Sequence, residues 1–88
     1  MAATVTAVGN TWTQVAANIA AVTLIQCTCP GLCEIEILAD AGTPAETDRG
    51  VRMAQRDTIG STQIADIGGS GALWAKKLTG SDVEVITL

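Results

Sequence analysis

The chain has 88 residues, of which 48% are hydrophobic and 16% charged, and nine acidic against five basic residues give it a net charge of −4. An acidic chain repels a phosphate backbone instead of releasing its counterions, which argues against direct binding to nucleic acid. The most apolar stretch, residues 15–25, is interrupted by Asn18 and falls short of the roughly 18 residues that a membrane span needs. The first ten residues lack the basic and apolar segments of a secretory signal. We therefore expect one soluble domain over residues 1–88, made in the cytoplasm, in which residues 1–19 could serve as an N-terminal arm or interface segment.

Short segments rich in Val, Ile or Thr follow one another along the chain, each bounded by Gly, Pro, Asn or Asp. In chain order they are TVTAV (4–8), AVTLIQCTC (21–29), CEIEIL (33–38), GVRMAQ (50–55), STQIADI (61–67), ALWAKK (72–77) and DVEVITL (82–88). Segments of this length at close to ten-residue spacing predict an all-β fold, a small antiparallel β-sandwich or barrel of about seven or eight short strands.

The segment 33–38 carries the strongest strand signal, because Cys33, Ile35 and Ile37 alternate with Glu34 and Glu36. Residues 15–22 could start a helix on their Ala content, but the β-branched residues that follow favour a loop and then a strand. Gly, Pro and alternating charges mark residues 40–50 as the longest loop, and GGSG (68–71) and TGSD (79–82) are typical of hairpin turns.

The apolar content is mostly Ala, Val, Ile and Leu, with no Phe or Tyr. A domain of this size buries only about 60 to 70% of its unfolded surface. Small aliphatic side chains then leave apolar surface uncovered, which indicates a protein partner. We expect a homo-oligomer with an interface of more than about 1,000 Å².

All three cysteines, Cys27, Cys29 and Cys33, fall within seven positions. Zinc would need a fourth ligand from Glu34 or another chain, because the sequence has no histidine, and the spacing is not that of a redox CxxC motif. The cysteines could be small buried hydrophobes, or a turn at Pro30-Gly31 could bring Cys33 beside Cys29. An odd number of thiols also invites a bond between chains, and we predict at least one disulfide, between subunits, formed in an oxidising medium.

The remaining candidate residues are interface or surface groups. Trp12 and Trp74 are expected to anchor the core or an interface, with sugar stacking as the alternative. Arg49, Arg52 and Arg56 form either solvated pairs with neighbouring Asp48 and Asp57 or a docking stripe for an acidic surface.

No catalytic constellation is recognisable. The chain has no histidine, no nucleophile beside an identifiable base and no paired carboxylates at a recognisable spacing. Asp40, Glu46 and Asp48 match no calcium loop and are better explained as a charged surface loop. We expect a protein without enzymatic activity, metal or cofactor.

The order AVTLIQCTCPGLCEIEILADAGTPAETDRGVRM, then a Gly-Ser-rich turn and GALWAKKLTGSDVEVITL, resembles small structural proteins of tailed-phage virions over residues 20–88. Such proteins are β-sandwich modules that decorate heads, form collars or fibres, or join tail parts, commonly as trimers. The resemblance implies a homotrimer located in the virion and bound to capsid, collar or tail proteins. Its alternative is a fibre-associated module that contacts a host-surface glycan through Trp12 or Trp74 and the 40–50 loop. The cysteine cluster departs from the family's pattern, so the resemblance assigns it no role.

Overall fold

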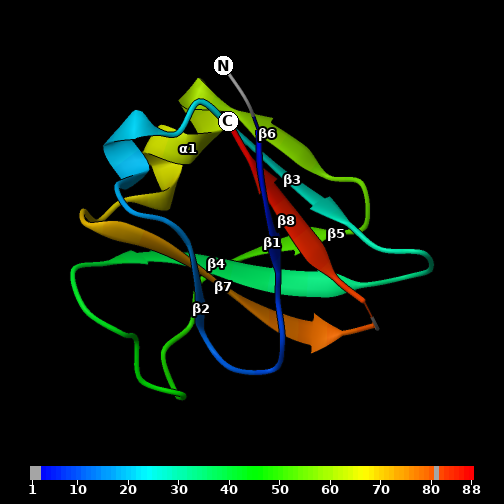
Figure 1. Ribbon diagram of the computed structural model, residues 1–88. Helices are drawn as coiled ribbons and strands as arrows, with labels where there is room; N and C mark the ends of the chain where they lie inside the picture. Colours follow the sequence, from blue (N-terminus) through cyan, green and yellow to red (C-terminus); the bar gives the residue numbers. More distant parts are fainter. Residues whose placement is uncertain (1–2, 81) are drawn as a thin grey trace.

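The computed structural model describes residues 3–80 and 82–88, which form a sandwich of two four-stranded sheets (Figure 1). The first sheet has the strand order β1 (Thr4–Ala7), β8 (Glu84–Thr87), β3 (Leu24–Thr28), β6 (Thr58–Gly60). The second has the order β2 (Thr13–Ala16), β7 (Ala72–Thr79), β4 (Glu34–Asp40), β5 (Val51–Ala54). All neighbouring strands are antiparallel. The predicted all-β fold with seven or eight strands is confirmed, as a sandwich.

The chain changes sheet at almost every connection. Of the described strands, only β4 and β5 are consecutive within one sheet, and residues 41–50 join them as the predicted long loop. Residues 68–71 lead from the helix α1 into β7, and residues 79–82, of which Ser81 lies outside the described residues, lead from β7 to β8 in the other sheet. The prediction of hairpin turns at these two places is therefore wrong.

Residues 61–67, predicted as a strand, instead form the helix α1 (Ser61–Ile67). Ile64 and Ile67 are three positions apart, so one helical face presents both to the core. The Gln63 side chain accepts a hydrogen bond from the Gly60 amide at the first turn, and Gly68 ends the helix with a φ of 74°. The 3₁₀ helix η1 (Ile19–Ala21) lies near α1 at the same end of the sandwich (Figure 1).

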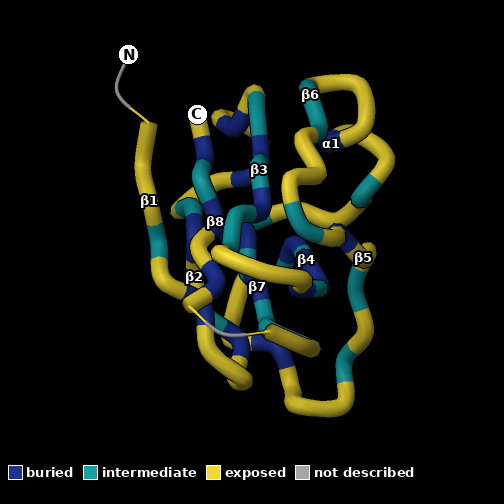
Figure 2. The backbone as a smooth tube through the Cα atoms, turned by 90° about the vertical axis from the view of Figure 1, so that its right-hand side faces the viewer, coloured by how far each residue is buried: buried dark blue, intermediate teal, exposed yellow. Residues whose placement is uncertain are grey.

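The core between the sheets is aliphatic. Buried residues lie on β3 and β8 on one side and on β4 and β7 on the other (Figure 2). They include Ile25, Ile35, Ile37, Leu73 and Val85. Strand alternation turns these residues inward. On the second sheet it places Glu36, Trp74 and Lys76 on the opposite, outer face.

The N-terminal segment contributes to both sheets. Over its described part, the segment 1–19 contains β1 at one edge of the first sheet and β2 at one edge of the second. Residues 1–2 lie outside the described residues.

Candidate functional site

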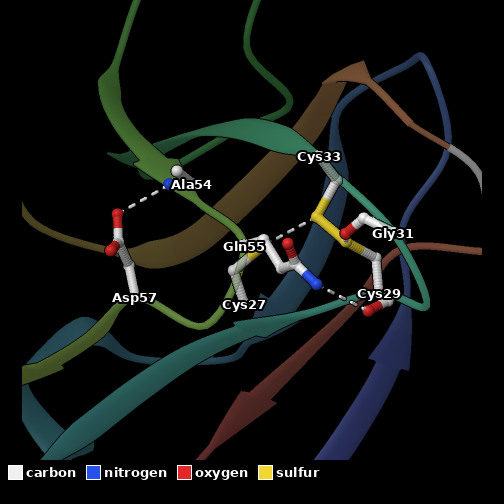
Figure 3. The surroundings of a disulfide bond; sticks show 7 residues. All are labelled: Cys27, Cys29, Gly31, Cys33, Ala54, Gln55 and Asp57. Carbon is white, nitrogen blue, oxygen red and sulfur yellow. Dashed lines mark hydrogen bonds between the residues drawn. A yellow bond between two sulfur atoms is a disulfide. The ribbon is translucent and has the colours of Figure 1, made fainter.

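The three cysteines meet where the chain crosses from the first sheet to the second. β3 ends at Thr28 and β4 begins at Glu34, and Cys29 and Cys33 bond to each other across this crossing (Figure 3). Cys27 is a free thiol with no exposed surface. Its sulfur lies 3.8 Å from that of Cys33. A disulfide is therefore present, as a bond within one chain, and a bond between subunits stays a prediction.

The segment after β5 fixes both sides of the cluster through its backbone. The Gln55 amide donates to the Cys33 carbonyl at 2.9 Å, and the Arg56 amide donates to the Cys27 carbonyl at 2.9 Å. The Cys27 amide donates in return to the Asp57 carbonyl at 3.1 Å. Because this turn bonds to β3 and to the residue directly before β4, it links the two sheets beside the disulfide.

Burial sets the chemical state of the free thiol. Burial raises the pKa of Cys27, and the nearby Asp57 carboxylate raises it further. The thiol is thereby kept protonated at neutral pH, the unreactive form of cysteine.

Gly80 allows the end of β7 to approach the cluster closely. Its φ is +102°, and a Cβ at this position would lie 2.6 Å from the Cβ of Cys33 and 2.9 Å from the Leu32 carbonyl oxygen. Glycine is therefore required here both for its conformation and for the space.

The outer face of the second sheet is covered by the loop 41–50, and the indole of Trp12 bonds to this loop while that of Trp74 bonds to Asp40, the last residue of β4. Trp12 donates from its indole N–H to the Ala45 carbonyl at 3.0 Å, and Trp74 donates to the Asp40 carbonyl at 3.2 Å. Lys76 places its ammonium 4.7 Å from the centre of the Trp12 ring and donates to the Glu46 carbonyl. Trp12 is only 6% exposed, so it is buried beneath the loop and has no free ring face for a sugar.

Glu36 is the buried charge beneath this loop. It is 1% exposed, and its carboxylate accepts from the Arg49 Nε at 3.1 Å and from the Gly50 amide at 2.6 Å. Burial alone raises the pKa of Glu36, but the Gly50 hydrogen bond and the Arg49 guanidinium, with Lys76 as a further positive charge, bring it below its ordinary value. Alternation correctly assigned Glu36 to the outer face, but the sequence did not reveal that the loop would cover it.

Within the described residues the arginines form no ion pair with Asp48 or Asp57, and the docking stripe stays a prediction. Asp48 accepts a hydrogen bond from the Ala45 amide, and Asp57 accepts one from the Ala54 amide, so both carboxylates cap turns. Within residues 3–80 and 82–88 the one ion pair joins Arg49 to Glu36. Arg52 lies opposite Glu36 in the β4–β5 register, and Arg56 occupies the following turn with a φ of 67°.

One side of the sandwich has edge strands without an ionisable side chain. It is formed by the edge strands β1 and β2, and we call it the β1–β2 side. A groove of about 520 Å³ runs along it, lined by Thr, Gln, Asn, Ala, Val and Leu residues without an ionisable side chain. Val5 on β1 is 54% exposed. The opposite side, formed by β5 and β6, carries Arg52, Arg56 and Asp57.

Comparison with protein-family models, with curated proteins and with solved structures finds no match. In the described part of the chain, no three His, Cys, Asp or Glu residues are grouped so that they could hold a metal ion. No helix in residues 3–80 or 82–88 is long and apolar enough to cross a bilayer.

Proposed function

We propose that the protein is a non-enzymatic structural component of a phage particle, a homo-oligomer that decorates the capsid or joins parts of the collar or tail. The phage assignment rests on the resemblance of residues 20–88. The observation that favours assembly is that neither edge strand of the β1–β2 side carries an ionisable side chain.

An exposed edge strand offers a row of backbone donors and acceptors to another chain. Proteins that remain monomeric protect such edges with charges, prolines, bulges or a covering segment. β1 has the sequence TVTA, pairs with β8 alone, and contains neither a charge nor a proline. It therefore lacks the side chains that would oppose pairing with a second strand.

A second copy of the chain is the partner that fits this side best. The chain carries a net charge of −4, so two copies repel each other over most surface orientations. When two copies meet through their β1–β2 sides, no ionisable side chain lines the groove of either copy. Val5 then gains apolar contacts that it lacks in the single chain. If three copies turn their β1–β2 sides toward a common axis, they form the trimer that the resemblance implies.

Light scattering coupled to size-exclusion chromatography tests this proposal. The purified protein should elute as one oligomer of defined mass at tens of micromolar, with no partner added. A monomer over this concentration range would contradict self-assembly. A monomer that binds a glycan array would instead support a receptor-binding module. Locating the protein in intact particles by electron microscopy tests the assignment to the virion.

A further inference from the structure

A buried free thiol lies in contact with a disulfide in this fold. Cys27 places its sulfur 3.8 Å from the Cys33 sulfur, which is bonded to Cys29 (Figure 3). Cys27 and Cys33 are 0% and 3% exposed, whereas Cys29 is only partly buried. The nucleophile and the bond that it could attack are thus adjacent, and Cys29 is the one of the three residues that is partly exposed.

We propose that the three sulfurs form a thiol–disulfide exchange site, in which Cys27 displaces Cys29 from Cys33 and so converts Cys29 into a site for covalent modification. In the exchange, the Cys27 thiolate attacks the Cys33 sulfur, the Cys27–Cys33 bond forms, and the Cys29–Cys33 bond breaks. Cys29 leaves as a thiolate. The proton lost by Cys27 is balanced by the one that Cys29 takes up from solvent, and no external oxidant or reductant is consumed.

The released Cys29 is the sulfur that an external reagent can reach. The Gly31 carbonyl oxygen lies 2.8 Å from the Cys29 sulfur and can accept a hydrogen bond from the thiol formed there. Its thiolate can attack an external disulfide, forming a mixed disulfide and releasing one thiolate of that reagent. The external reactants that Cys29 would attack are therefore disulfides, either of small molecules or exposed on other proteins.

The surroundings of Cys27 control the rate of exchange. Its neighbours are Cys33 from the position before β4, Val85 opposite it on β8 and Asp57 from the turn before β6. Asp57 is the charged group among them, and its carboxylate disfavours the thiolate. The folded protein should therefore exchange slowly at neutral pH and faster at alkaline pH, because only the thiolate attacks.

Differential alkylation of the folded, never-reduced protein tests the exchange. The protein is treated with iodoacetamide at pH 7 and at pH 9, then unfolded, reduced and treated with N-ethylmaleimide. Tandem mass spectrometry then identifies the cysteine that carries the first label. We expect that label on Cys29, with a rate at least tenfold higher at pH 9.

The variant Cys27→Ala is the matched control, because it keeps the Cys29–Cys33 bond and removes the nucleophile. It should acquire no iodoacetamide label at either pH. If this variant fails to fold, the mass spectrum of the wild-type protein still shows which cysteine carries the first label. A label on Cys27, or no label on the folded protein at either pH, would overturn the proposal.

Discussion

Replacing Glu36 by Gln removes the buried charge that holds the loop 41–50 against the second sheet. The carboxylate accepts two hydrogen bonds, one from the Gly50 amide and one from Arg49. Glutamine keeps the size of the side chain but has only one oxygen. One of the two donors must therefore face an NH₂ group or lose its partner.

The two interactions differ in strength. The Arg49 side chain is 69% exposed, so solvent screens its ion pair, which contributes at most about 1 kcal/mol. The Gly50 amide bonds to a buried carboxylate, and a hydrogen bond to a charged group contributes about 1.5–3 kcal/mol. Glutamine retains part of this bond, so we expect Glu36→Gln to lower the free energy of unfolding by about 2 kcal/mol. In a domain of this size, that loss lowers the melting temperature by about 10 °C.

Urea unfolding followed by tryptophan fluorescence measures the change, because Trp12 bonds to this loop and Trp74 bonds to Asp40, the residue before it. Glu34→Gln is the matched control. Glu34 lies on the same strand and the same face, and its side chain is neither buried nor paired with a cation among the described residues. It should change the free energy of unfolding by less than about 0.5 kcal/mol. Equal effects of the two substitutions would refute the role of the buried carboxylate.

Three further predictions concern acid, Gly80 and the disulfide. Because the pKa of Glu36 is lower in the folded chain, the unfolded chain binds its proton first as the pH falls. This contribution to stability is complete above the unfolded pKa of about 4.3 and is lost below it, as the pH falls through the folded pKa. Stability curves measured between about pH 6 and pH 2 should therefore be flatter for Glu36→Gln than for the wild type, and parallel curves would contradict this. Gly80→Ala should cost about 2 kcal/mol or more, because it introduces both strain and overlap, whereas Gly31→Ala, which meets no atom within 4 Å, should be nearly neutral. Reducing the Cys29–Cys33 bond, which closes a short loop, should lower the free energy of unfolding by about 2 kcal/mol, and an unchanged urea midpoint after reduction would exclude a stabilising role.

The strands could be predicted where the side chains alternate and face a single core. In β4, Ile35 and Ile37 turn inward as the pattern indicates. The helix α1 was missed because STQIADI contains β-branched residues, while the spacing of Ile64 and Ile67 and the following Gly68-Gly69 were the available helical signals.

The contacts across the sheets could not be predicted in the same way. The sequence drew attention to Trp12 and to the loop 40–50 separately, but only the folded chain places the indole N–H against the Ala45 carbonyl. Glu36 was assigned to the correct face, and its burial depends on Arg49 and Gly50 folding back over it. The cysteine spacing permitted a bond between Cys29 and Cys33, but local sequence could not decide between that bond and one to another chain.

The β1 edge is the most direct test of assembly through the β1–β2 side. Val5→Lys adds a charge to β1, where Val5 is 54% exposed, and Val51→Lys adds the same charge to β5 on the opposite side, where Val51 is 45% exposed. Sedimentation equilibrium at tens of micromolar should find the wild type and Val51→Lys as the same oligomer and Val5→Lys as a monomer. If all three proteins sediment as monomers, or if Val5→Lys remains as oligomeric as the wild type, the protein does not assemble through this edge.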